Sequence, residues 1–225
     1  IRVPTGAYGG GGPYHSGTNE SSILPIKGIK IVYPSNAADM KGLMKAAFYD
    51  PNPVVIFEHK GIYWSKVPGT EGAKTPEPSK DYRIPLGKAR IHLSASQDAI
   101  ENGESLTIIT YGMGVWWASN AAKSFDGNVE IVDLRTLSPC DDEAIYSAVK
   151  RHGKVIVLTE ETLNNSFAQA IAGRIQEHCF QSLDAPVKCI GSKDVPAIPL
   201  HVDLEKEILP NAEKVATAIQ TLLDY

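Results

Sequence analysis

Residues 106–132, LTIITYGMGVWWASNAAKSFDGNVEIV, contain the pattern that decides the fold. The apolar run 106–109 is typical of a strand buried on both faces, and 129–132 is a second run rich in β-branched residues. Between them, 113–125 has the length and composition of a helix. Two strands that are joined through a helix lie parallel in one sheet. The stretch therefore predicts a βαβ unit of an α/β protein.

The same alternation continues to the C-terminus. Residues 142–152 begin with acidic side chains, end with basic ones and are followed by Gly153, which is typical of a complete helix. Further strands and helices are expected, in order, at 155–158, 167–183, 187–190 and after Pro210-Asn211. We therefore predict a mainly parallel sheet, covered by helices, over residues 86–225.

The N-terminal part is a second, shorter α/β piece. Residues 1–4 are expected to be extended. The glycine cluster region, which covers the first twenty-odd residues and has its glycines at 6–12, is expected to be a loop without a packed helix. The elements expected after it are a strand at 31–33, a helix that starts at the Asn36 N-cap, and a buried strand at 54–57. About sixty residues are too few for a complete domain, so residues 1–62 are interpreted as the C-terminal part of one.

Residues 63–85 separate the two pieces. They contain prolines at 68, 76, 78 and 85, and their apolar residues show no period. Such a composition is typical of an interdomain linker, which we predict here.

The composition excludes several classes of protein. The 225 residues are 43% hydrophobic and 21% charged, which is ordinary for a globular protein. A net charge of −4 provides no basic surface for nucleic acid, and apolar runs of at most four residues are too short to span a membrane. Three cysteines indicate neither a disulfide framework nor a zinc site, so we expect a reducing compartment. Because the chain starts at Ile1, we expect an internal piece of a longer protein.

One motif has the layout of a dinucleotide-binding fingerprint. Gly112 and Gly114 follow the first strand of the βαβ unit, and Asp133 ends the second strand, at the distance of a ribose-binding carboxylate. The third glycine position is Trp117, although the motif requires a very small side chain there. An ordinary βαβ turn is therefore favoured over an NAD-binding Rossmann domain, which stays open as an alternative.

His15 is the histidine most suited to a functional role. It follows the glycine cluster in a loop without an apolar period, and imidazole transfers protons near neutral pH. The bare amides of the loop could cradle a phosphate, but no Gly-Lys-Ser/Thr sequence follows, so close approach to a ligand or another subunit is favoured. The other histidines show no metal-ligand spacing; they are His59, His92, His152, His178 and His201.

Three glutamates stand at the ends of predicted strands: Glu58, Glu160 and Glu161. α/β proteins bind ligands at the carboxyl ends of their strands. Solvated strand ends are the commoner case, however, and that interpretation is favoured for these glutamates.

Several blocks of the sequence resemble one family. The run GGGGPYHS at 9–16 is similar to the active-site loop of the β subunit of the decarboxylating component of 2-oxoacid dehydrogenase complexes. Further similar blocks follow in the family's order at 28–34, 41–43, 52–58, 84–89, 132–139 and 183–186. The chain thus resembles a C-terminal fragment of such a β subunit, or of the β segment of a fused chain.

The resemblance implies the end of a pyrimidine-binding domain followed by a transketolase C-terminal-like domain. It implies a thiamine-diphosphate-dependent enzyme that decarboxylates a 2-oxoacid and reductively acylates the lipoyl group of an acyltransferase. A branched-chain acid such as 2-oxoisovalerate is the expected substrate, with pyruvate as the alternative. The cofactor and magnesium would be held mostly by absent segments or by the α partner, so the fragment alone is expected to be inactive. Alternatively, it acts only as a subunit-interface and acyltransferase-docking module.

The resemblance also implies partners and a location. The partners are an α subunit or fused α segment, a second β copy, the lipoyl acyltransferase core and a small 2-oxoacid. Neither nucleic acid nor a membrane is expected as a partner. The implied location is the cytoplasm, or the mitochondrial matrix in a eukaryote.

Particular residues match the family's functional positions. His15 matches its active-site histidine, which orients substrate and passes a proton during acyl transfer to lipoyl. Ala47, Asp50 and Asn52 match a place where some members hold potassium through main-chain carbonyls. The chain departs from the family at Gly17, where Gln is usual, and at 165–167, where Asn-Ser-Phe replaces Gly-Gly-Phe and the turn could differ.

Overall fold

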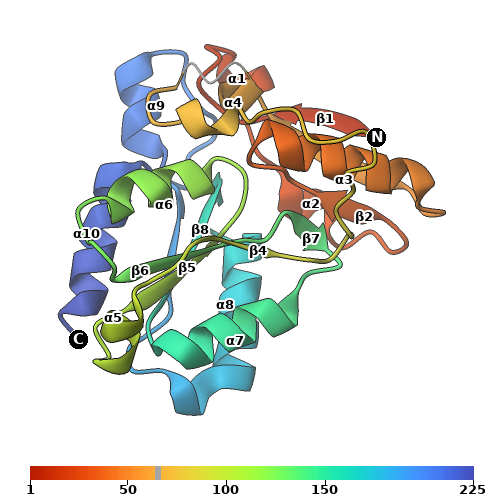
Figure 1. Ribbon diagram of the computed structural model, residues 1–225. Coiled ribbons are helices and arrows are strands. Elements are labelled where there is room, and N and C mark those ends of the chain that lie inside the picture. The colour runs from red at the N-terminus through yellow and green to blue at the C-terminus, as the bar shows by residue number, and fades with distance from the viewer. Residues whose placement is uncertain (64–66) are drawn as a thin grey trace.

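The computed structural model describes residues 1–63 and 67–225, and these residues form two sheets (Figure 1). In the N-terminal sheet the strand order is β1 (Arg2–Thr5), β3 (Val54–His59), β2 (Lys30–Val32) and β7 (Thr136–Ser138). In the C-terminal sheet it is β4 (Arg90–Leu93), β6 (Val129–Asp133), β5 (Leu106–Thr110), β8 (Val155–Thr162) and β9 (Lys188–Ser192). Most neighbouring strands are parallel, which confirms the predicted α/β class.

Helices connect these strands. The longer ones are α3 (Ala37–Tyr49), α6 (Gly114–Ala122), α7 (Asp142–His152), α8 (Phe167–Cys179) and α10 (Ala212–Leu223). The shorter ones are α1 (Gly12–His15), α2 (Glu20–Ile23), α4 (Lys60–Tyr63), α5 (Gln97–Glu101) and α9 (Val202–Ile208), with 3₁₀ turns at Glu71–Ala73 and Phe180–Ser182. Among the described residues, no helix has the length and apolar character needed to cross a membrane.

The C-terminal sheet is covered by helices on both faces, as predicted. Its central strand, β5, is buried along its whole length and runs parallel to β6 and β8, while β4 forms an antiparallel edge. Helices α6 and α10 share one core with Ile108 and Ile131, and α7 and α8 share the other core with Ile109 and Val132. Because consecutive residues of a strand point to opposite faces, each apolar run supplies both cores.

Side-chain caps set the ends of the predicted helices. Asn36 accepts a hydrogen bond from Asp39 N at the start of α3, and Asp141 accepts one from Ala144 N at the start of α7. Gly153 ends α7 with a φ of +65°, in the left-handed region. Both helices are therefore confirmed, and their ends depend on residues close in the sequence.

The N-terminal sheet includes β7, a strand that the sequence did not predict. Strand β3 lies between β1 and β2 and is parallel to both. On its other side, β2 pairs antiparallel with β7, so that Ile31 lies opposite Ser138. The part of the chain after residue 86 thus completes the sheet formed by the first sixty residues.

The expectation that the glycine cluster region contains no helix is wrong. Helices α1 and α2 are single turns within it. Pro13 occupies the first turn of α1, where its missing N–H leaves no hydrogen bond unmade, and Leu200 packs against Gly12. Helices this short are unstable alone, so contacts with the rest of the protein hold them.

The predicted linker segment is packed against its neighbours. Ala73 and Ile84 are buried, and Ile84 N donates a hydrogen bond to Gly42 O in α3. Asn120 in α6 donates to Gly69 O. The described residues of this segment therefore contact both parts of the protein.

Candidate functional site

His15 stands at the end of α1 and is exposed, as is Tyr14 before it. The glycine loop, defined here as residues 6–17, carries this turn to the surface. Four of its residues have a positive φ: Gly6, Tyr8, Gly10 and Gly12. Tyr8 is unusual among them because it has a side chain, and its hydroxyl accepts a hydrogen bond from Trp117 Nε1 at 3.1 Å. Contacts with α6 thus help to set the path of the loop.

Two carboxylates at the end of β8 hold the chain on either side of His15. Glu160 Oε1 accepts a hydrogen bond from Ala7 N at 2.8 Å. Glu161 accepts from Ser21 N at 2.9 Å and from Ser21 Oγ at 2.8 Å. Both glutamates are buried, so their interpretation as solvated strand ends is wrong: the main chain before and after His15 covers them.

The third strand-end carboxylate is also buried. Glu58 accepts hydrogen bonds from Arg2 and from the hydroxyl of Tyr63, and it is 4% exposed. A buried carboxylate requires such partners. The solvated interpretation is therefore wrong for Glu58 as well.

His59 lies beneath the start of the glycine loop. Its Nε2 is 2.6 Å from Glu160 Oε2, and its Nδ1 accepts a hydrogen bond from Gly61 N at 3.1 Å. Because Nδ1 accepts, these partners assign the ring proton to Nε2, which donates to Glu160. Gly6 has a φ of +86°, and a Cβ atom there would lie 2.2 Å from His59 Nε2. The loop therefore rests directly on the imidazole ring.

Glu20, the first residue of α2, is fully buried, and neither of its carboxyl oxygens has a hydrogen-bond partner among the described residues. Burial, followed by the charge of Glu161, raises its pKa well above the ordinary value of 4.5. Burial likewise raises the pKa of the neighbouring Tyr33 and Tyr111. Glu20 consequently keeps its proton at pH values at which an exposed glutamate has lost it.

Replacing Glu20 by glutamine is expected to stabilise the protein, increasingly so as the pH rises above 4.5. A carboxyl group whose pKa is raised by folding contributes stability below its unfolded pKa, and this contribution is lost as the pH rises. Glutamine does not titrate. Thermal unfolding of the full-length protein between pH 4 and 8 should show a widening difference in Tm, with about 2–4 °C for each kcal/mol.

Glu104→Gln is the matched control, since Glu104 is exposed. It should leave the pH dependence of Tm unchanged. A constant difference in Tm between Glu20→Gln and the wild type at all pH values would contradict the raised pKa of Glu20.

A polar crevice of about 180 Å³ lies next to the turn that carries His15. Ser16 and Asn19 line one side, and Thr162 and Ser192, at the carboxyl ends of β8 and β9, line the other. Ser16 Oγ is buried without a hydrogen-bond partner among the described residues. Parallel α/β sheets bind ligands at the carboxyl ends of their strands, so this crevice is the candidate binding site nearest to His15.

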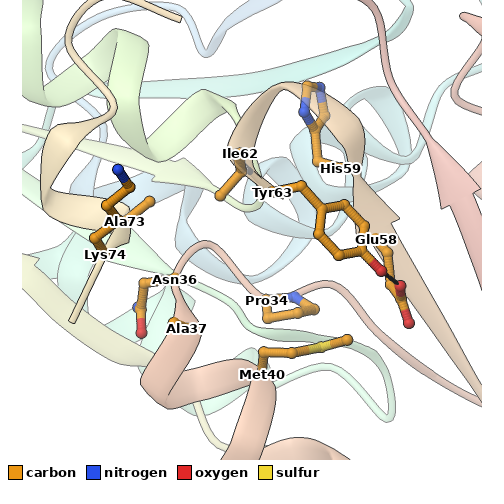
Figure 2. Close-up of a pocket in the computed structure, with 10 residues that line it drawn as sticks. All are labelled: Pro34, Asn36, Ala37, Met40, Glu58, His59, Ile62, Tyr63, Ala73 and Lys74. Carbon is orange, nitrogen blue, oxygen red and sulfur yellow. Dashed lines mark hydrogen bonds between the residues drawn. The ribbon is translucent and has the colours of Figure 1, made fainter. Parts of the chain in front are cut away.

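Figure 2 shows a separate, mainly apolar cavity of about 240 Å³. Met40 lies on one side of it, and the hydroxyl of Tyr63 points to Glu58. The ring of His59 turns away from Met40, towards the opposite end of the view. The crevice is lined by Pro13 and Ser16, on either side of His15, whereas no described residue of the glycine loop lines this cavity, so we do not assign it to the His15 site.

The residues of the predicted potassium site lie together where α3 ends. Ala47 O accepts a hydrogen bond from Asp50 N, and the Asp50 carboxylate binds Lys30 Nζ at 2.5 Å. Lys30, followed by Asn52, lowers the pKa of Asp50 to about 2. Because an ammonium group already neutralises this carboxylate, these side chains offer no cradle for a further cation. The main-chain potassium site stays a prediction.

The glycine turn before α6 is occupied by the N-terminal part of the chain. Gly112 has a φ of +54°, and a Cβ atom there would lie 2.6 Å from the ring of Tyr33. Asp133 is fully buried and accepts hydrogen bonds from Ser35 Oγ at 2.5 Å and Arg90 at 3.1 Å. A dinucleotide would need both the turn and this carboxylate, so the structure supports the ordinary βαβ turn.

Sequence reasoning selected His15 but missed the groups that hold its loop. The contact of Gly6 with His59 and the burial of Glu20 have no counterpart in the sequence pattern. The one available signal was the consecutive pair Glu160–Glu161 at a strand end. Two such carboxylates on neighbouring positions can bind main-chain amides on both sides of a strand.

The comparisons with known proteins agree with this architecture. The family model "Transketolase, pyrimidine binding domain" matches residues 1–65, and "Transketolase, C-terminal domain" matches residues 97–215. A solved structure described as a split-gene transketolase, an inactive beta4 tetramer, has a TM-score of 0.73 at 20% identity, covering 100% of this chain and 66% of that one. At this identity the likeness concerns the fold.

Curated relatives are similar over the whole chain. The 2-oxoisovalerate dehydrogenase subunit beta of Bacillus subtilis is 39% identical, covering 100% of this chain and 65% of the relative. The pyruvate dehydrogenase E1 component subunit beta of Rhizobium meliloti is 35% identical, covering 99% and 45%. The chain therefore spans less than two thirds of the length of these relatives. From the two family models and the fold, the chain belongs to the transketolase family and carries residues of its pyrimidine-binding domain followed by its C-terminal domain.

Proposed function

We propose that the chain is part of the decarboxylating component of a 2-oxoacid dehydrogenase complex, which reductively acylates the lipoyl group of an acyltransferase. The observation that carries this proposal is the exposed His15 beside a polar crevice at the carboxyl ends of β8 and β9. The relatives named as 2-oxoisovalerate and pyruvate dehydrogenase subunits support it. A branched-chain 2-oxoacid is favoured over pyruvate, because the 2-oxoisovalerate dehydrogenase subunit is the more similar of these two relatives.

His15 is proposed to act on the substrate and on the lipoyl group. Its exposed imidazole can donate a hydrogen bond to the oxygen of a 2-oxoacid and pass a proton to a lipoyl sulfur during acyl transfer. Thiamine diphosphate, when bound, supplies the electron sink for decarboxylation. The Ser16 Oγ beside His15, which is buried and has no hydrogen-bond partner among the described residues, fits a polar ligand at this edge of the pyrimidine-binding domain.

The diphosphate and magnesium are proposed to be held by other polypeptide. Among the described residues there is no group of three or more His, Cys, Asp or Glu side chains placed to bind a metal ion. We assign these ligands to the α subunit, a fused α segment or the part of the parent protein outside this chain.

Exposed apolar side chains next to His15 support a partner at this surface. Tyr14 is 89% exposed, and Leu200, which contacts Gly12, is 66% exposed. Apolar patches of this kind mark interfaces. We propose an α subunit or fused α segment here, with a second β copy and the acyltransferase core in the assembly. The same patch favours the second candidate function, docking without catalysis.

The proposed location is the cytoplasm, or the mitochondrial matrix in a eukaryote. One relative, from Arabidopsis thaliana, is a 2-oxoisovalerate dehydrogenase subunit named as mitochondrial, and another is from the bacterium Bacillus subtilis.

The full-length protein, purified with its α partner, is expected to release CO₂ from 2-oxoisovalerate when thiamine diphosphate and Mg²⁺ are present. Its kcat/KM should exceed that for pyruvate by about tenfold or more, since each added methylene in an apolar pocket contributes roughly 10–200-fold. Omitting thiamine diphosphate is the control. A correctly assembled protein that decarboxylates neither acid would support docking alone, and a preference for pyruvate would make pyruvate the substrate.

A further inference from the structure

We propose that Glu160 and His59 form a positioning pair that holds the start of the glycine loop and thereby keeps His15 in place. The inference rests on the catalytic role proposed for His15. Glu160 lines the crevice next to His15, but its two carboxyl oxygens are already bound to Ala7 N and His59 Nε2, so we propose that the pair acts through His15.

The pair joins three distant segments of the chain. Glu160 lies near the end of β8, His59 ends β3, and Ala7 belongs to the glycine loop that follows β1. The side chain of His59 is 0% exposed and that of Glu160 is 5% exposed, so water does not compete for these hydrogen bonds. The C-terminal sheet is thereby connected to the loop of the N-terminal sheet.

The directions of the hydrogen bonds require a carboxylate at position 160. Oε1 accepts from Ala7 N at 2.8 Å, and Oε2 accepts from His59 Nε2 at 2.6 Å. An amide has only one acceptor oxygen, so its NH₂ group would face either Ala7 N–H or His59 Nε2–H. Moving the ring proton to Nδ1 removes the second conflict, but Nδ1–H would then face Gly61 N–H. Glutamine therefore leaves one pair of donors opposed in every arrangement.

The contact between the His59 ring and Gly6 fixes the backbone of the glycine loop relative to the pair. Gly6 lies against the imidazole ring so closely that it leaves no space for a Cβ atom. On the far side of His15, Ser21 is bound by Glu161. With both ends held, a shift of Ala7 must be absorbed by the turn that carries His15.

Glu160→Gln in the full-length assembled protein is expected to slow lipoyl acylation about 10–100-fold, because a displacement of about 1 Å can lower a rate 10²-fold. His15→Ala should slow the same step. Decarboxylation is measured in parallel with an artificial electron acceptor. In the double variant His15→Ala/Glu160→Gln, Glu160→Gln should add less than about a threefold loss, since a positioning residue has no effect once its target is absent. If Glu160→Gln instead caused a general structural defect, the rate loss in the double variant would be the product of the losses in the two single variants.

Hydrogen–deuterium exchange gives a readout that is independent of activity. The peptide containing Ala7 should exchange faster in Glu160→Gln than in the wild type and at the wild-type rate in His15→Ala. Glu104→Gln, at an exposed site, is the control and should change neither rate. Multiplicative losses, or unchanged exchange at Ala7, would overturn the inference.

If Glu160→Gln does not fold, a pair of His59 variants carries the same test. Glutamine can still donate to Glu160 and accept from Gly61, whereas leucine can do neither. His59→Gln should therefore acylate lipoyl within about threefold of the wild type, and His59→Leu should be about 10–100-fold slower. Equal rates in the two variants would overturn the pair. A wild type without activity on any 2-oxoacid would instead refute the proposed function.

Discussion

His15→Ala is expected to lower the rate of lipoyl acylation by about 10²–10⁴-fold, the usual contribution of a general acid or base. The imidazole is exposed on a single helical turn, and the backbone around it is held by other residues. Truncation at such a surface position changes stability by only about 0.5 kcal/mol. The loss should therefore appear in the rate of acyl transfer while the protein remains folded and assembled.

The measurement is single-turnover acylation of the lipoyl domain by the full-length protein with its α partner, together with decarboxylation monitored by an artificial electron acceptor. Acyl transfer should fall further than decarboxylation, because proton transfer to the lipoyl sulfur requires the imidazole directly. His178→Ala, on the exposed side of α8, is the matched control and should retain wild-type rates. Unchanged acylation in His15→Ala would refute the role assigned to His15.

Gly6→Ala is expected to destabilise the protein by about 2–5 kcal/mol. Part of this is the cost of a side chain at φ +86°, about 1–2 kcal/mol. The rest comes from the added methyl group, which would lie 2.2 Å from His59 Nε2. Overpacking in a closed site costs about 1–3 kcal/mol, and the ring cannot move without breaking its bonds to Glu160 and Gly61.

Gly10→Ala separates the two contributions. Gly10 has a φ of +60°, but a Cβ atom there would meet nothing within 4 Å. Its substitution should therefore cost only about 1–2 kcal/mol from the backbone. Urea denaturation of the two full-length variants should give the lower midpoint for Gly6→Ala. Equal midpoints would show that the contact with His59 is not decisive.

Local signals in the sequence were sufficient for the five longer helices and for most strands. The start of α7 at Asp141 and its end at Gly153 depend on hydrogen bonds within four residues, so they can be recognised without the fold. Strand β7 is different, because Ser138 pairs with Ile31 across more than one hundred positions. Its three residues have no periodic pattern of their own, and the sheet alone makes them a strand.

The candidate site likewise has one part that the sequence indicates and another that only the structure shows. His15 was found from the residues around it, since a glycine cluster followed by an unburied imidazole is visible along the chain. The burial of Glu160 and Glu161 was not foreseen, because the groups that cover them, Ala7 and Ser21, are 153 and 140 positions away. A charged residue at a strand end does not by itself show whether water or another segment of the chain will bind its side chain.

The α/β class, the order of the longer helices and most strands, and the exposure of His15 follow from the sequence itself, because each depends on residues that are neighbours along the chain. Only the tertiary structure decided that His59 meets Glu160 beneath Gly6, and that the Glu20 carboxyl group is enclosed without a hydrogen-bond partner among the described residues. These features arise where the two sheets pack together. Contacts between segments so far apart are set by the closure of the fold, and they leave no periodic trace in either segment.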